Sequence, residues 1–407
     1  MFEFGRDLRK LFAQAREGED LGWVELIGVD LLAAEARRET VDAGRVSCAR
    51  PFETEKRACA LWRDHARRSG QTASLDRADL ASDSLARSAS GQDQIALAAI
   101  EKAQVLMLRF DLCGGPDLLN QSIAVLDAVA RPRRARLTGE LSPVHARIRA
   151  RMARLSGEGP ALMDALALMD AALHTTGQKD VDLRLDRAGL ALEAGVVNRD
   201  ARLLDQAGRD LGALVEDASP DYRPLTRARA LALCGAGLAA LAALADHAEA
   251  QMQGRVMFDA AADQFTPDHS PLDWAAIQVL RASDDALPLM LLNQAELMTQ
   301  GQGLIIGALV RERRLTREVG LAEAVRDKTG LDLLEARVFA RLAKASPLDW
   351  VADQIGLAEL SLARARLGSA RSNHLALILH EAALAARELG APVFAERAVS
   401  LLAQTEI

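Results

Sequence analysis

Eight arginines and one acidic residue, Glu140, lie within residues 131–154, which makes this segment the sharpest charge feature of the chain. Arg147, Arg151 and Arg154 follow the i, i+4, i+7 spacing that places side chains on one face of a helix. Guanidinium groups bind carboxylates and phosphates through paired N–H donors. The cluster predicts a docking surface for an acidic partner or an anion, with a solvated Arg-rich helix and loop as the alternative. Its members are Arg131, Arg133, Arg134, Arg136, Arg147, Arg149, Arg151 and Arg154.

An acidic stretch lies further along the chain, between residues 246 and 285. It holds eight carboxylates against two arginines, Arg255 and Arg281. Patches of opposite sign can steer a partner through their field, or can pair between copies of the chain. A homo-oligomer is therefore compatible with the sequence, although ordinary surface charge is the simpler interpretation.

Four amide side chains are candidates for contacts with a partner. The set is Gln278, Asn293, Gln354 and Asn373. Gln278 and Gln354 each follow a tryptophan by four residues, which is one helical turn further along the same side. We expect Trp274 and Trp350 to be packing anchors between helices. The asparagines are included only because of their polarity and helical context.

The other chemically capable residues form no recognisable reaction centre. Seven histidines are scattered without an H-E-x-x-H motif, G-x-S-x-G is absent, and the four cysteines have no C-x-x-C spacing. The segment GQGLIIG, residues 301–307, spaces its glycines one residue away from the dinucleotide fingerprint and follows no predicted strand. We therefore predict no catalytic residues, no metal site and no cofactor, and we do not expect an enzyme.

Composition predicts an all-α chain that does not bind nucleic acid. Half of the 407 residues are apolar, whereas aromatic residues are only 3% and Tyr222 is the one tyrosine. Alanine and leucine favour helices, while strands favour β-branched and aromatic residues. The net charge of -7 gives no long-range attraction for nucleic acid, so a nucleic-acid partner is not expected.

The helices must begin where the sequence provides start signals, and one signal occurs twice. SPLDWAAIQ occupies residues 270–278 and SPLDWVADQ residues 346–354. Serine at the N-cap, proline at the first helical position and aspartate at the third all favour a helix start. Other prolines also precede long Ala/Leu/Arg-rich runs and are predicted first-turn residues: Pro51, Pro116, Pro143, Pro160, Pro288 and Pro392.

The two phrases resemble the opening of repeat units in divergent bacterial tetratricopeptide-like proteins. There, Pro-Leu-Asp-Trp-Ala leads through a glutamine into Leu-Gly. This chain departs from that pattern at Leu280 and has Val351 in place of the alanine. The resemblance implies antiparallel helix hairpins stacked in a right-handed solenoid. The separation of 76 residues predicts two units of about 38 each.

The organisation expected along the chain has three parts. Residues 1–68 are predicted to be an N-terminal helical segment, and 93–407 to be the helical-repeat solenoid, with a sub-boundary at 131–143. Residues 69–92 are polar with widely spaced leucines, which marks them as a mobile or weakly packed segment.

The chain is expected to be cytoplasmic without a membrane span. The first twelve residues carry charges where a secretory signal needs an apolar run, and scattered cysteines suit a reducing compartment. The apolar run from Ala230 to Ala245 is shorter than the roughly 20 residues that cross a bilayer. We expect neighbouring helices to bury it.

These observations favour a non-enzymatic scaffold or adaptor that binds a peptide or helix of a partner protein on a concave face. The alternative is a regulatory sensor whose superhelix responds to a ligand or a peptide. The sequence does not identify the partner.

Overall fold

The structure is a computed structural model that describes residues 21–129, 135–177, 180–282, 287–369 and 374–404. Within these ranges it contains one 3-10 helix, eighteen α-helices and no strand, which confirms the all-α prediction. The helices are η1 (Gly22–Leu26), α2 (Val29–Ala43), α3 (Pro51–Ser69), α4 (Thr72–Ser88), α5 (Gln92–Cys113), α6 (Asp117–Asp127), α7 (Ala135–Ser156), α8 (Gly159–Thr176), α9 (Val181–Asn198), α10 (Ala201–Asp217), α11 (Pro224–Ala245), α12 (Ala248–Gln264), α13 (Pro271–Arg281), α14 (Leu289–Thr299), α15 (Ile305–Ala324), α16 (Lys328–Leu342), α17 (Pro347–Arg366), α18 (Leu375–Glu388) and α19 (Pro392–Ala403).

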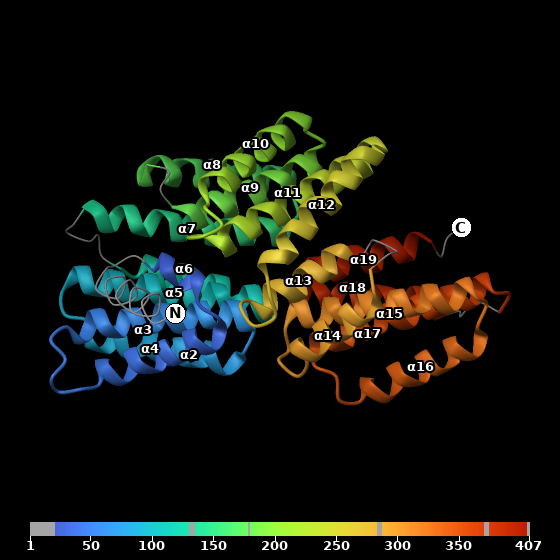
Figure 1. Cartoon of the computed structure of the whole chain (residues 1–407), viewed down its shortest axis with the longest axis horizontal. Coiled ribbons are helices and arrows are strands. Elements are labelled where there is room, and N and C mark those ends of the chain that lie inside the picture. The colour runs from blue at the N-terminus through green and yellow to red at the C-terminus, as the bar shows by residue number, and fades with distance from the viewer. Residues whose placement is uncertain (1–20, 130–134, 178–179, 283–286, 370–373, 405–407) are drawn as a thin grey trace, which may run out of the picture.

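The helices pack in a regular order. From α2 onward each helix contacts the next one in the chain. The odd-numbered helices also contact each other, α3 with α5, α5 with α7, α7 with α9, α9 with α11, and again from α13 to α19. Figure 1 shows three groups, with α7–α12 placed over α2–α6 and with α13–α19 beside both.

The chain returns to its own beginning after α12. Helix α3 contacts α13, α5 contacts α15, and η1 contacts α11. Leu272 and Leu304 join the same buried cluster as Trp62 and Leu75, so one apolar core spans this junction. We call the junction the seam. Because the core continues across it, residues 1–68 are not packed apart from the later helices in the part of the chain that the structure describes.

Of the six predicted first-turn prolines, three lie in the first turn, two immediately precede it and one lies inside a helix. Pro51, Pro160 and Pro392 lie at the first or second helical position, and Pro116 and Pro288 are N-cap residues. Pro143 instead lies inside α7, because that helix already begins at Ala135. The proposed sub-boundary at 131–143 therefore falls partly within a helix.

The two copies of the repeated phrase begin their helices differently. The Ser346 side chain accepts a hydrogen bond from the Asp349 backbone N–H at 3.3 Å, as predicted for an N-cap. The Ser270 hydroxyl instead donates to the Asp273 carboxylate at 2.6 Å, and makes no side-chain cap. Both tryptophans pack into apolar clusters, with Trp274 buried and Trp350 half-buried.

Residues 69–92 are a packed helix rather than a mobile segment. Within them, α4 carries Leu75, Ala78 and Leu85, each with 0% exposure. The spacing of these residues, i, i+3 and i+10, keeps them on one face of the helix. Two serines, Ser74 and Ser82, are buried on the same face, so the polar composition of the stretch concealed its buried side.

Helix α11 is only partly covered. By length and composition it is apolar enough to cross a membrane, the one such helix among the described residues, and 28% of its most apolar stretch is buried. Leu225, Ala228 and Leu231 are buried, but Leu244 near its end is exposed. The expectation that neighbours bury this helix is therefore wrong for its C-terminal part.

Candidate functional site

A cavity of about 640 Å³ lies where the odd-numbered helices converge. Its lining comes from η1, α3, α5, α7, α9, α11 and α13, with Ile306 added by α15. A neighbouring cavity of about 1160 Å³ shares Arg63, Gln104 and Arg147 with it, so the two adjoin. Ligand sites favour concave surfaces in this size range. We call the first of these the central cavity and treat it as the candidate site.

The predicted arginine face of α7 is directed at carboxylates of the same chain. The Arg151 guanidinium bonds both oxygens of Asp111 on α5, at 2.7 and 2.8 Å, and reaches Asp186 on α9 at 3.3 Å. Arg147 bonds the same Asp186 at 2.6 Å. The prediction that these arginines form an open docking surface is therefore corrected, because their donors already hold three helices together.

The remaining members of the cluster are dispersed. Arg154 bonds Glu193 at 2.7 Å, and Arg149 points to solvent from the opposite side of α7. Arg136 lies in the first turn of α7, and its side chain is outside the described part of the structure. Arg131, Arg133 and Arg134 lie outside the described residues altogether.

The electrostatics of this contact favour the charged forms of Arg147, Arg151 and Asp186. Burial alone would raise the pKa of the Asp186 carboxyl, but Arg147 and Arg151 outweigh burial and hold the pKa well below its ordinary value. Desolvation opposes the charge on Arg151, while Asp111 and Asp186 raise its pKa. The group is a paired and hydrogen-bonded network that stabilises the packing of α5, α7 and α9.

Arginine–carboxylate pairs recur at a nearly constant sequence separation. Within the described residues, eight pairs join residues 38 to 44 positions apart, and each links one odd-numbered helix to the next. The pairs are Arg63–Glu101, Arg151–Asp111, Arg147–Asp186, Arg154–Glu193, Arg229–Asp273, Arg311–Asp349, Arg366–Glu323 and Arg397–Glu359. The separations begin at the predicted unit of about 38 residues and extend beyond it. Asp273 and Asp349 hold the same position in their phrases and the same role in these pairs.

One carboxylate that lines the central cavity differs from the others in its contacts. Asp182, the second residue of α9, has 52% of its side chain exposed, and its nearest cation is Arg67 at 3.9 Å. Every other carboxylate lining the central cavity accepts at least one hydrogen bond within the described residues. Asp182 therefore has both oxygens available to a ligand.

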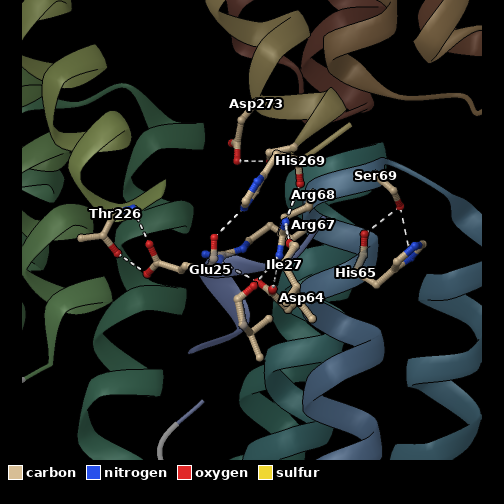
Figure 2. Close-up of polar contacts among 12 residues, drawn as sticks. Glu25, Ile27, Asp64, His65, Arg67, Arg68, Ser69, Thr226, His269 and Asp273 are labelled. Atoms are coloured by element: carbon tan, nitrogen blue, oxygen red, sulfur yellow. Dashed lines mark hydrogen bonds and ion pairs between the residues drawn. The ribbon is translucent and has the colours of Figure 1, made fainter. Parts of the chain in front are cut away.

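A set of buried side chains, joined by hydrogen bonds, lies beside the central cavity at the seam (Figure 2). Arg68 has 0% exposure and donates to the backbone carbonyls of Val24, Ile27 and His269. The Glu25 carboxylate accepts from the backbone N–H and the hydroxyl of Thr226, at 2.8 and 2.6 Å, and so caps α11 from 201 residues away. These contacts fix η1 against α3, α11 and the loop before α13.

The structure does not bring together the amide side chains that were predicted to contact a partner. Gln278 is 1% exposed and so cannot line an open groove, which corrects that prediction. Gln354 is half-buried, and neither glutamine lines the central cavity. Asn293 is exposed on α14 and accepts from Arg314 at 3.3 Å. Asn373 lies outside the described residues.

Metal ligands and reactive thiols are not brought together in the described residues. No group of three or more His, Cys, Asp or Glu side chains there is arranged to hold a metal ion. All four cysteines are unpaired. Burial raises the pKa of the Cys59 thiol far above its ordinary value, which keeps it protonated. Gly301 and Gly303 shape the turn before α15 and follow helix α14 rather than a strand.

Sequence reasoning missed the residues that line the centre of the cavity, above all Arg67, Asp182 and Arg229. Nothing in their local sequence distinguishes them from surface charges. A search for arginine and carboxylate residues separated by about 38 positions would have found several of the pairs around them. No protein-family model and no curated protein sequence matches the chain.

Proposed function

We propose that the protein is a non-enzymatic interaction scaffold with a tetratricopeptide-like solenoid fold, and that it binds a peptide segment of a partner protein in the central cavity. The observation that carries the proposal is the cavity itself, lined almost entirely by one set of helices and rich in charged side chains. Stacked helical units expose such a surface because each unit contributes one helix to it.

Three further features support the proposal. Odd-numbered helices contact each other in series, arginine–carboxylate pairs recur at about one repeat length, and the repeated phrase opens two helices of that series. The arginines tie neighbouring helices together, which restricts movement of the cavity walls. A rigid surface loses little conformational entropy when a peptide binds. A cytoplasmic location, in keeping with unpaired cysteines, belongs to the same proposal.

Site-specific photo-crosslinking in native cells tests this function. A photoreactive residue would be placed at Val181 or Ala276, which line the central cavity, and in control chains at Leu80 or Leu333, which are exposed on α4 and α16. We expect one partner protein to be captured from the two cavity positions and not from the controls. Capture of the same partner with equal yield from α4 and α16 would contradict the proposal.

The seam supports a second candidate, a regulatory sensor that opens and closes around its ligand. The first helices contact α13 and α15, so access to the cavity can change if these contacts separate. Small-angle scattering distinguishes the two candidates. A sensor changes its radius of gyration when the crosslinked partner's peptide is added, whereas a scaffold keeps the same value.

A further inference from the structure

We infer that the central cavity selects peptide segments that carry a basic and an acidic side chain close together. The basic side chain would bind Asp182, and the acidic side chain would bind Arg67 and Arg229. This inference rests on the proposed peptide-binding function and names the chemistry of its ligand.

Asp182 provides the anionic half of the site. It projects from the first turn of α9, where the helix dipole favours a negative charge. Burial alone would raise the pKa of this carboxyl, but Arg67, Arg147 and Arg229 outweigh burial and lower it. Asp182 is therefore ionised at neutral pH, half-exposed, and free of hydrogen bonds within the described residues. A ligand ammonium or guanidinium can approach it without displacing a protein group.

Arg67 and Arg229 provide the cationic half. Arg67 on α3 bonds Asp64 through Nη2 at 2.7 Å, and Arg229 on α11 bonds Asp273 through Nη2 at 2.6 Å. A guanidinium group has five N–H donors, so these single bonds occupy a minor part of each. Among the described residues no further hydrogen bond is made by either side chain, and the remaining donors can bind a ligand carboxylate.

Charge balance explains why one sign alone is not enough. The pairs around Asp182 are internally neutral: Arg67–Asp64, Arg147–Asp186 and Arg229–Asp273. A purely acidic peptide leaves Asp182 without a partner, and a purely basic peptide leaves the remaining donors of Arg67 and Arg229 without one. A peptide with both signs places its basic side chain on Asp182 and its acidic side chain on these donors, so each of its charges meets an opposite charge.

Binding of four synthetic peptides to the full-length protein tests the inference. Twelve-residue fluorescent peptides would carry alternating Glu and Lys, Glu alone, Lys alone, or neutral Gln, each diluted with Ala, and binding would be followed by anisotropy. We expect the alternating peptide to bind at least about tenfold more tightly than any other, a difference equal to roughly 1.4 kcal/mol. The preference should weaken at high salt.

Substitutions test which residues of the central cavity bind the basic and the acidic side chains of the peptide. Asp182→Asn should weaken binding of the alternating peptide and strengthen binding of the Glu peptide by about fivefold or more, because the charge left without a partner is removed. Arg229→Gln should weaken both of these peptides. The matched control is Asp205→Asn, since Asp205 is a well-exposed residue of α10 outside the cavity and should leave all four affinities unchanged.

The outcomes separate this inference from the proposed function. Preference for a single-sign peptide, equal binding of all four, no binding of the alternating peptide, or no effect of Asp182→Asn each overturns the charge rule. If photo-crosslinking at Val181 and Ala276 still captures a partner, the proposed function stands and only the charge rule fails. If those positions capture nothing, the proposed function itself fails.

Discussion

At the scale of single residues, the charged side chains of this protein act mainly on one another. Arg151 joins Asp111 to Asp186, and Arg68 supplies three backbone carbonyls with hydrogen bonds inside the core. Buried ionic groups of this kind contribute little net stability when complete, yet removal of one partner leaves an uncompensated charge. The cost of losing such a residue therefore far exceeds that of losing an exposed neighbour.

Arg151→Ala tests this difference. The change removes the three hydrogen bonds that Arg151 donates to Asp111 and leaves Asp186 with Arg147 as its hydrogen-bond donor. We expect the free energy of unfolding to fall by on the order of 3 kcal/mol. Urea unfolding followed by circular dichroism measures it.

The control for this change is Arg149→Ala, two residues away on the same helix and exposed to solvent. It should alter stability by about 0.5 kcal/mol or less. Equal decreases in the free energy of unfolding of the two variants would mean that the Arg151 contacts do not stabilise the fold.

The lowered pKa of buried His65 predicts that the protein loses stability in mild acid. Burial, followed by the charge of Arg68, lowers the pKa of His65 to about 4, while an unfolded histidine titrates near 6.5. In this pH range the unfolded chain binds a proton at His65 that the folded chain does not bind. The free energy of unfolding therefore falls as pH drops from about 6.5 toward 4. Between pH 7 and 5 the expected loss is about 2 kcal/mol.

Urea unfolding at the two pH values measures this loss, and His65→Gln should make the dependence shallower. His380→Gln is the control, because His380 is exposed on α18. An unchanged slope in His65→Gln would assign the acid sensitivity to other groups. The paired carboxylates act in a separate window, since arginines lower the pKa of Asp64, Asp186 and Asp273 and their contribution is lost only below about pH 4.

At the scale of elements, the short helix η1 connects distant parts of the chain. Its Glu25 caps α11. Arg68 of α3 donates to the Val24 carbonyl within η1, to the Ile27 carbonyl directly after it, and to the His269 carbonyl. A helix of five residues has no stability of its own, so these contacts determine its place. The seam depends on them in turn.

Arg68→Met keeps the length of the side chain but removes its donors. We expect a loss of on the order of 3 kcal/mol and faster hydrogen exchange in residues 22–27 and 266–270, because three buried carbonyls lose their partner. Hydrogen-exchange mass spectrometry locates the change. Arg45→Met, at an exposed position after α2, should leave exchange in both segments as it was, and a uniform increase over the whole chain would contradict a local role.

At the scale of the whole molecule, the seam decides how the cavity is enclosed. Besides the contacts of α3 with α13 and α5 with α15, the Gly115 N–H donates to the Leu389 carbonyl at 2.9 Å. The turn after α5 thus touches the turn before α19. At this point Gly114 has a φ of 77° and approaches the Leu389 backbone so closely that a Cβ atom would overlap its carbonyl.

A pair of glycine substitutions separates this contact from backbone strain. Gly91 has a φ of 84° but nothing within 4 Å of an added Cβ, so Gly91→Ala adds only the backbone cost of about 1–3 kcal/mol. Gly114→Ala adds the same strain and also separates the two turns. We expect a greater loss of stability and a larger radius of gyration for Gly114→Ala, as measured by urea unfolding and small-angle scattering. Identical radii in the two variants would show that this contact does not enclose the molecule.

Helix content and helix starts followed from local chemistry, and so the sequence predicted them. Proline at the first turn, serine before it and an Ala/Leu-rich run act within a few residues of each other, so no distant contact is needed to interpret them. Residues 69–92 were misjudged because two leucines share their buried face with an alanine and two serines, which lowers the apolar content of the stretch. Their helical spacing was present, but composition concealed it.

The sequence by itself determined the all-helical class and the starts of those helices that follow a proline or a serine start signal, because these depend on backbone preferences and on periodic apolar positions. Only the tertiary structure decided which charges face each other. It turned Arg147 and Arg151 inward, buried Gln278, left the Asp182 side chain without a hydrogen bond among the described residues, and brought Glu25 to Thr226. The physical reason is that the energy of a polar contact depends on distance in space and not on separation in the chain. Arg397 and Glu359 lie 38 residues apart in the chain, and Glu25 and Thr226 lie 201 apart.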